Sequence, residues 1–327
     1  MRRRDFVTGI VGCAAAWPVA SVAQQALTPV IGFMSSRGPD DSEHLVTAFR
    51  EGMRTSGFVE GQNVAVKYRW ARGQYDRLPN LAAELANDHV SLLVATGGEP
   101  SVLAAKTATS SIPIVFTTGG DPVRIGLVQS FSHPGGNMTG VSLLTTAPEA
   151  KRLGLLHELV PTATVFGVLI DPNYHEAEEQ AREVIEAGRT IGTRIEIAYA
   201  GNDRDLELAF SSLVERKAAA LLVASDPFFD TRRDRIIELA ARSGLPAIYQ
   251  FREYAAAGGL MSYGINLADG YRQVGVYAGQ ILKGVPPANL PIYQSVKFEF
   301  VLNLKTAHTL AIEVPPALSA RADEIIE

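Results

Sequence analysis

The stretch LLVATGGEPSVLAAKTATSSIPIVFTTGGDP, residues 92–122, decides the fold of this chain. A short apolar run, Leu92–Ala95, leads through a glycine pair into an alanine-rich segment, and a second β-branched run, Ile114–Phe116, leads into another glycine pair. Short β-branched runs that alternate with helical segments are typical of a parallel sheet covered by helices. The stretch therefore predicts an α/β fold.

The same alternation continues on both sides of this stretch and forms two series. The helix expected at Asp205–Arg216 has apolar residues at i, i+3, i+4, i+7 and i+8, which place one apolar face against a sheet. We therefore expect two lobes of similar design, each with its own sheet. The expected strands are Val30–Met34, Val64–Tyr68, Leu92–Ala95, Ile114–Phe116 and Thr139–Leu143, then Val165–Ile170, Arg194–Ala198, Ala220–Ala224 and Ala247–Tyr249.

The chain continues beyond the second series, which indicates more than one crossing between the lobes. A strand at Gly258–Tyr263, a long helix at Leu267–Lys283 and a final strand at Val296–Asn303 follow, and the proline-rich connector Gly284–Pro291 fits neither a helix interior nor a central strand. Several crossings make a hinge and leave a cleft between the lobes. We assign residues 24–143 and 258–287 to the first lobe and residues 144–257 and 288–327 to the second, with the place of the C-terminal tail left open.

Composition excludes several classes of protein. A chain of 327 residues is long enough for two compact domains or one large one. Hydrophobic residues make up 46% and charged residues 20%, close to the average of globular proteins, which excludes disorder, collagen and coiled coil. The formal net charge of −5 attracts neither nucleic acid nor an anionic membrane surface, so we expect no nucleic-acid partner.

Residues 1–23 have the pattern of an export signal, and we expect cleavage after Ala23. Three arginines precede an apolar stretch, Val7–Val22, which ends in small residues. The order Arg-Arg-Asp-Phe-Val from Arg3 resembles a twin-arginine signal, and the general secretory route is the alternative. Cys13, the only cysteine, also fits a lipoprotein box. Because the apolar stretch continues past it, we favour a soluble exported protein whose mature chain has no thiol.

Sequence motifs of enzymes and cofactor sites are absent. The chain has no G-x-G-x-x-G and no G-x-x-x-x-G-K-[ST], which leaves dinucleotide and P-loop nucleotide binding unsupported, and it has no G-x-S-x-G nucleophile elbow. His157-Glu158 and His175-Glu176 begin like zinc-binding helices but lack a second histidine at the required spacing. We expect no cofactor, no metal and no catalytic residue.

Small polar residues and glycines follow three strands of the first series. Ligands of open α/β sheets bind beyond the carboxyl ends of the strands, where loops and helix N-termini converge. Gly97 and Gly98 precede a helix that begins near Pro100, so backbone N–H groups and the helix dipole there suit a carboxylate. For each edge, an ordinary β-to-α turn without a ligand is the alternative. The candidate ligand contacts of this lobe are Ser35, Ser36, Gly97, Gly98, Thr118, Gly119 and Asp121.

The second series offers larger side chains at the same edge. Asn173 and Tyr174 follow its first strand, and Asp226 and Phe228 follow its third. Asp226 suits a ligand ammonium, while Phe228 or Tyr174 suits the apolar part of a ligand. Alternatively, Asp226 caps a helix and Phe228 belongs to the core. Tyr263, on the returning strand, either faces the same cleft or packs on a helix.

These strand edges favour an amino acid or a small aromatic or branched carboxylate over a sugar. The glycine and hydroxyl edges suit a carboxylate, and Asp226 suits an ammonium. Sugar sites usually stack the ring between aromatic side chains and surround it with several charged or amide groups. The edges described above are poor in Asn, Gln and Arg.

Five segments together match a known pattern: 57–63 (GFVEGQN), 121–142, 258–264 (GGLMSYG), 297–306 (KFEFVLNLKT) and 315–324 (PPALSARADE). With them the chain resembles the substrate-binding proteins of ABC transporters with the type I periplasmic-binding fold, in the group that includes tryptophan- and tyrosine-type binders. The resemblance extends from about Val30 to the last residue. Where this group commonly has Asn-Pro after the first strand of the second lobe, this chain has Asp171-Pro172, followed by Tyr174.

The resemblance implies two Rossmann-like lobes, a hinge with three crossings and a ligand cleft between the lobes. It implies a periplasmic protein that captures a small organic solute by lobe closure and delivers it to an ABC permease and its ATPase at the inner membrane. We expect this protein to be a monomer. Two alternatives stay open. A periplasmic sensor of the same fold would lack permease and ATPase genes beside its own, and a hydrolase would turn over esters or amides.

Overall fold

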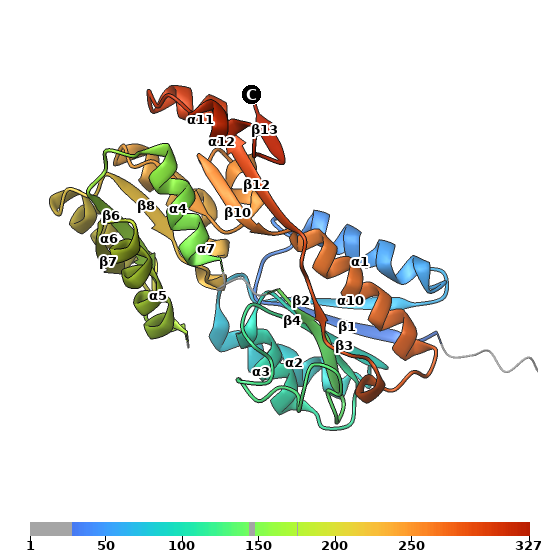
Figure 1. The fold of residues 1–327 in the computed structure, drawn as a ribbon. Coiled ribbons are helices and arrows are strands. Elements are labelled where there is room, and N and C mark those ends of the chain that lie inside the picture. Colours follow the sequence, from blue (N-terminus) through green and yellow to red (C-terminus); the bar gives the residue numbers. More distant parts are fainter. Residues whose placement is uncertain (1–27, 144–147, 175) are drawn as a thin grey trace, which may run out of the picture.

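The computed structural model describes residues 28–143, 148–174 and 176–327. The expected export signal, its cleavage after Ala23 and Cys13 lie outside these residues. The described chain forms two lobes, each a mainly parallel sheet covered by helices, so the predicted α/β fold is confirmed (Figure 1). None of the helices in this part of the chain combines the length and the apolar character that a membrane crossing requires.

The first lobe contains a six-stranded sheet in the order β11-β5-β4-β3-β1-β2, and all of its pairs are parallel. Strands β3 and β4 are buried along their whole length, which explains their unbroken apolar runs. The strands are β1 (Val30–Ser35), β2 (Ala65–Trp70), β3 (Leu92–Thr96), β4 (Ile114–Thr118), β5 (Met138–Ser142) and β11 (Tyr293–Gln294). The helices are α1 (Glu43–Thr55), α2 (Leu78–Asn87), α3 (Glu99–Ala108) and α10 (Leu267–Leu282), with short 3-10 turns η1 (Tyr75–Arg77) and η2 (Pro287–Asn289).

The second lobe contains a seven-stranded sheet in the order β13-β12-β10-β9-β8-β6-β7, in which β12 runs antiparallel to β10. The strands are β6 (Val165–Ile170), β7 (Arg194–Tyr199), β8 (Ala220–Val223), β9 (Ala247–Tyr249), β10 (Met261–Ile265), β12 (Phe298–Asn303) and β13 (Glu324–Ile326). The helices are α4 (Glu149–Leu159), α5 (Ala177–Thr190), α6 (Asp203–Glu215), α7 (Pro227–Thr231), α8 (Arg233–Arg242), α9 (Arg252–Ala256), α11 (Leu304–Thr309) and α12 (Pro316–Ser319).

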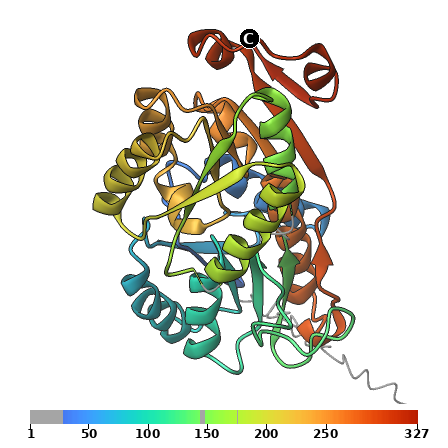
Figure 2. The same ribbon diagram turned by 60° about the vertical axis from the view of Figure 1, so that its left-hand side comes forward.

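The chain crosses between the lobes three times. The crossings lie between β5 and α4, between β10 and α10, and between β11 and β12. The C-terminal crossing runs along one side of the molecule from the first lobe to the second (Figures 1 and 2). Because all three connections are short, the lobes stay adjacent and their strand ends face one another.

The two sheets correct the predicted lobe boundaries at two places. Strand β10 pairs with β9 and β12, so residues 258–265 belong to the second lobe rather than the first. Strand β11 pairs with β5, so residues 288–295 belong to the first lobe rather than the second. The apolar pattern of a short strand indicates that it joins a sheet but does not say which sheet, because the pairing depends on residues far away in the sequence.

Helix α10 returns to the first lobe and packs directly on α1. Glycines permit this contact, because a Cβ atom at Gly275 would overlap the carbonyl oxygen of Phe49, and one at Gly52 would overlap that of Arg272. The backbones of the two helices therefore touch along this line. This packing fixes the N-terminus of α10, which lines the cleft, to the rest of the first lobe.

We predict that Gly275→Ala lowers the free energy of unfolding by about 1–3 kcal/mol, because the added methyl group must push α1 away from α10. Gly154→Ala, inside α4, is the matched control. The Cβ position of Gly154 has no heavy atom within 4 Å, so this change raises the free energy of unfolding by about 0.5–1 kcal/mol. Urea unfolding of both variants measures the difference, and equal effects would contradict the proposed backbone contact.

Candidate ligand site between the lobes

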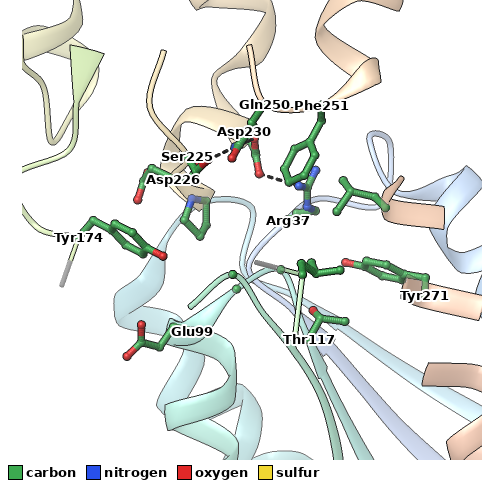
Figure 3. Close-up of a pocket in the computed structure, with 16 residues that line it drawn as sticks. Arg37, Glu99, Thr117, Tyr174, Ser225, Asp226, Asp230, Gln250, Phe251 and Tyr271 are labelled. Atoms are coloured by element: carbon green, nitrogen blue, oxygen red, sulfur yellow. Dashed lines mark hydrogen bonds and ion pairs between the residues drawn. The ribbon is translucent and has the colours of Figure 1, made fainter. Parts of the chain in front are cut away.

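A pocket lies between the lobes, at the carboxyl ends of strands from both sheets (Figure 3). The space between its lining residues that is free of protein atoms, the open mouth included, measures about 450 Å³. Strands β1, β3, β4, β8 and β9 lead into it, as expected for open α/β sheets. Its lining residues are Arg37, Gly97, Gly98, Glu99, Thr117, Gly119, Leu143, Leu267 and Tyr271 of the first lobe, and Tyr174, Ser225, Asp226, Pro227, Asp230, Gln250 and Phe251 of the second.

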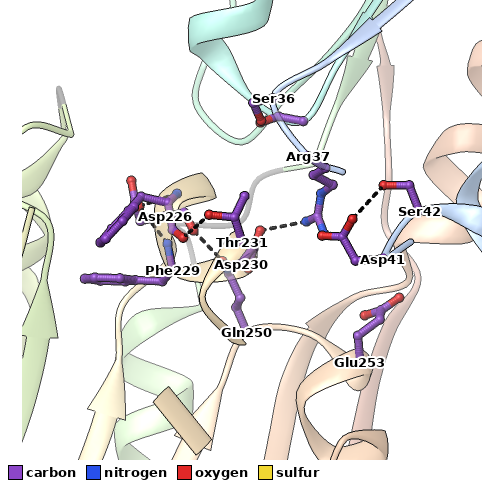
Figure 4. A network of polar contacts seen from close by, with 12 residues as sticks. Ser36, Arg37, Asp41, Ser42, Asp226, Phe229, Asp230, Thr231, Gln250 and Glu253 are labelled. Carbon is purple, nitrogen blue, oxygen red and sulfur yellow. Dashed lines mark hydrogen bonds and ion pairs between the residues drawn. The ribbon is translucent and has the colours of Figure 1, made fainter. Parts of the chain in front are cut away.

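An ion pair joins the two lobes inside this pocket (Figure 4). Arg37 follows β1 and donates from Nη2 to Oδ2 of Asp230, on α7, at 2.7 Å. Both side chains are 6% exposed, so the pair is shielded from water. Gln250 donates from Nε2 to Oδ1 of Asp230 at 2.5 Å, and the Tyr254 hydroxyl donates to the same oxygen at 3.3 Å. Burial raises the pKa of Asp230 to about 6, although Arg37 opposes this shift.

Asp226 begins α7 and lines the same pocket. Its Oδ1 accepts hydrogen bonds from the backbone N–H groups of Phe228 at 2.6 Å and Phe229 at 3.2 Å, which makes it the N-cap of the helix. The helix-cap alternative is therefore confirmed, and the ligand role stays a prediction. Burial raises the pKa of Asp226 well above its ordinary value, and the carboxylate of Asp171 adds to the shift. Such a carboxylate favours a cationic group beside it.

Gly97 and Gly98 form the turn from β3 into α3, with φ angles of +81° and +103°. A Cβ atom at Gly97 would lie 2.5 Å from Oγ of Ser36, which donates to the Gly97 carbonyl oxygen at 2.5 Å. A Cβ atom at Gly98 would lie 2.5 Å from Cγ of Pro227, on the opposite lobe. The turn therefore requires glycine for its backbone conformation and for the close approach of the two lobes.

The structure brings part of the predicted ligand set together. One glycine-turn pair, one further glycine and two side chains of the second lobe meet in the pocket (Figure 3). Together they place backbone groups at the start of α3 in the same pocket as a carboxyl group and a phenol ring. These residues are Gly97, Gly98, Gly119, Tyr174 and Asp226.

The other predicted residues of the first lobe support the pocket without lining it. The hydroxyl oxygen of Ser35 accepts from the backbone N–H of Arg37 at 3.2 Å. The hydroxyl of Ser36 donates to the Gly97 carbonyl oxygen in the glycine turn. Thr118 is fully buried at the end of β4. Asp121 accepts from the two N–H groups of its own loop, at positions 123 and 124. The position of a residue after a strand end does not tell whether its side chain lines the pocket or forms hydrogen bonds that stabilise the turn beside it.

Three predicted residues of the second lobe also lie outside the pocket. Asn173 and Phe228 line a neighbouring hollow with Tyr75 of the first lobe. Phe228 is buried, as its core alternative states. Tyr263 stacks on Phe298 with the ring centroids 5.7 Å apart, because β10 carries it within the second sheet.

The sequence prediction missed several lining residues. Arg37 and Gln250 are among them, so the expectation that the strand edges are poor in Asn, Gln and Arg is wrong for the pocket. Thr117, Ser225, Gln250 and Phe251 directly follow or end predicted strands, so the strand-end rule could have included them. Leu267 and Tyr271 come from α10, and only its packing on α1 brings them to the cleft. The missed residues are Arg37, Glu99, Thr117, Leu143, Ser225, Pro227, Asp230, Gln250, Phe251, Leu267 and Tyr271.

Further ion pairs join the lobes at the edges of the cleft. His44 of α1 pairs with Glu253 of α9 at 2.9 Å, and Arg124 pairs with Glu179 of α5 at 2.6 Å. Each such surface pair contributes little to stability by itself. Together with the buried pair of Arg37 and Asp230, they show that the lobes are in direct contact around the pocket.

Comparison with known proteins agrees with this architecture. The family model described as ABC transporter substrate binding protein matches residues 30–326. A tyrosine-binding protein from Clostridioides difficile (strain R20291) is 26% identical over 281 residues, which is 81% of this chain and 76% of the relative. The chain therefore belongs to the family of ABC transporter substrate-binding proteins, a family of solute-binding proteins rather than enzymes.

Two solved structures show the same fold. A Streptococcus pneumonia domain in complex with L-Trp has a TM-score of 0.82 at 21% identity, covering 91% of this chain and 100% of that one. A ligand-free, open substrate-binding protein with adhesive properties from Clostridium difficile has a TM-score of 0.66 at 24% identity, covering 91% and 99%. The lobes of this chain thus superpose better on the tryptophan complex than on the ligand-free, open structure.

We predict that Gly98→Ala prevents full closure of the lobes, because its Cβ atom would overlap Pro227 across the pocket. Gly57→Ala is the matched control: its φ of +82° imposes similar backbone strain, and its Cβ position has no atom within 4 Å. Small-angle scattering with a saturating solute should give Gly98→Ala a larger radius of gyration than either the wild type or Gly57→Ala. Identical radii for all three proteins would refute a closure contact at Gly98.

Proposed function

We propose that the protein is the periplasmic component of an ABC importer, which captures a small organic solute by lobe closure and delivers it to the permease and its ATPase. The observation that carries this proposal is a pocket with charged groups from both lobes, surrounded by direct contacts between the lobes. A solute that touches both lobes binds the closed state best and shifts the population toward it. The pattern of residues 1–23 supports export to the periplasm, where we propose a monomer.

The proposed solute is an amino acid or a small aromatic or branched carboxylate. The turn at Gly97 and Gly98 precedes α3, whose first N–H groups suit a carboxylate. Across the pocket, Oδ1 of Asp226 serves the helix cap, which leaves Oδ2 to accept from an ammonium. Tyr174 lies beside Asp226 and offers an aromatic surface to an apolar solute part (Figure 3). The tyrosine-binding relative and the L-Trp complex support the same solute class.

A thermal-shift screen of amino acids, aromatic acids, sugars and polyamines tests the proposed function. We expect an amino acid or an aromatic or branched carboxylate to raise the melting temperature. A solute at about 100 times its dissociation constant stabilises the folded protein by roughly 2.7 kcal/mol, which is readily detected. A response to sugars alone would overturn the proposed solute class.

We predict that Asp226→Asn lowers the affinity for an amino-acid solute by at least about 10-fold. The asparagine amide keeps an oxygen for the N-cap but lacks the charge that attracts the ammonium. Asp323→Asn is the matched control, since Asp323 also accepts from a backbone N–H, that of Phe300 at 2.7 Å, and lies outside the pocket. Isothermal titration calorimetry measures both affinities. An equal affinity for the two variants would remove Asp226 from the binding role.

A further inference from the structure

The buried ion pair of Arg37 and Asp230 restricts which solutes the pocket accepts. Arg37 is the only cationic side chain among the described residues that line the pocket. Beyond Asp230, its surroundings are the ring of Phe251, whose centroid lies 6.0 Å from the guanidinium carbon, and the carboxyl groups of Asp41 and Glu253, which act on it more weakly than Asp230. Among the described residues, the other donors to the Asp230 carboxylate are neutral: the Gln250 amide and the Tyr254 hydroxyl. Each charge is therefore the main counter-charge of the other.

A solute with a single charge disturbs this balance. A carboxylate that takes Arg37 leaves Asp230 buried with neutral donors. An ammonium that takes Asp230 leaves Arg37 with the ring of Phe251 and the weaker carboxyl partners Asp41 and Glu253. Breaking a buried pair on one side is strongly unfavourable, because the remaining charge recovers neither its partner nor its hydration. A solute that carries both charges removes this difficulty, since it supplies a partner to each side.

The cation of the pocket comes from the first lobe, and two of its carboxyl groups come from the second. The first lobe contributes Arg37 and the N-terminus of α3, which attract an anion, together with the side chain of Glu99 in the first turn of that helix. The second lobe contributes Asp226, the N-cap of α7, and Asp230, four residues further along in that helix, and both line the pocket. A molecule with a carboxylate at one end and an ammonium nearby fits this arrangement in one orientation.

We propose that Arg37 and Asp230 select zwitterions, and that a bound solute replaces their direct ion pair with two pairs. Its carboxylate pairs with Arg37 in addition to the N–H groups of α3, and its ammonium pairs with Asp230 in addition to Asp226. This inference rests on the proposed function and narrows its solute class. The exchange leaves the net charge of the pocket unchanged. The solute then joins the lobes electrostatically through two ion pairs in the pocket, where the closed lobes without solute have one.

The test compares three probes that share the 4-hydroxyphenyl-ethyl skeleton and differ in the charged groups attached to it. They are L-tyrosine, 3-(4-hydroxyphenyl)propionate, which lacks the ammonium, and tyramine, which lacks the carboxylate. L-tryptophan with its indole-propionate and tryptamine counterparts forms a parallel set. We expect the wild type to bind one of the amino acids about 100-fold more tightly than either single-charge counterpart. Isothermal titration calorimetry gives the dissociation constants.

Two substitutions should reverse this preference in opposite directions. In Asp230→Asn we expect weaker binding of the amino acid and at least about 10-fold tighter binding of the propionate, because Arg37 is then free and no carboxylate is stranded. In Arg37→Gln we expect tighter binding of the amine instead, because Asp230 is then free and no guanidinium is left without its partner. Asp234→Asn, which removes the same charge from a side chain that is 81% exposed, should change neither preference. Melting curves establish that each variant is folded, and either of the two substitutions suffices if the other does not fold.

The outcomes separate this inference from the function on which it rests. If the wild type binds an amino acid and the folded variants keep its ranking of the three probes, zwitterion selection by this pair is wrong while the proposed function stands. If the wild type binds the propionate as tightly as the amino acid, the inference is also wrong. If neither probe set binds and only sugars do, the proposed solute class fails and the inference fails with it.

Discussion

The ion pair between Arg37 and Asp230 is the buried contact that joins the two lobes in the closed arrangement of this structure. The partners are 193 residues apart in the sequence and belong to different sheets, so they meet only when the lobes close. Removal of two charges from water is costly, and a buried pair is tolerated where further hydrogen bonds satisfy its remaining atoms. Gln250 and Tyr254 provide such bonds to the carboxylate. The pair therefore determines where the lobes meet more than how stable each lobe is.

Short helix α7 brings the second lobe into this position. It begins directly after β8, and the cap formed by Asp226 fixes its first turn. Glycines of the first lobe permit the approach, since a Cβ atom at Gly98 would overlap Pro227 and one at Gly73 would lie 2.9 Å from Oγ1 of Thr231. The same small helix thus supplies two carboxylates to the pocket and the surface against which the first lobe closes. The charge of the solute and the position of the lobes are coupled because both act through α7 and its N-cap, Asp226.

Much of the fold can be predicted from the sequence because its strands are buried on both faces. Such strands appear as unbroken apolar runs, as in β3 and β4, and the helices between them show a clear periodicity. Strand β11 has two residues and no pattern of its own, and the sheet to which β10 belongs depends on its contacts with β9 and β12. These two features therefore escape a local analysis, and the predicted lobe boundaries fail there.

In the candidate site too, residues with a local sequence pattern could be predicted, and residues whose role depends on a distant partner could not. The glycine turn at Gly97 and the cap at Asp226 lie at strand ends, and the rule for open α/β sheets finds them. Arg37 and Asp230 carry no local signal, because a charged residue in a loop or a short helix acquires its role only from the partner that closure brings to it. Ser36 illustrates the opposite error, since it lies at a strand end but supports the turn beneath the pocket.

The central claim is that a bound solute holds the two lobes in the closed arrangement. The most direct test is the distribution of distances between spin labels on the two lobes, measured by pulsed electron resonance. Thr107 of α3 and Arg182 of α5 are exposed sites for these labels, in a chain whose Cys13 is replaced by serine. We expect a broad distribution without solute and a single narrow one at the shorter distance with a saturating solute. A distribution that stays unchanged when the solute binds would contradict the account.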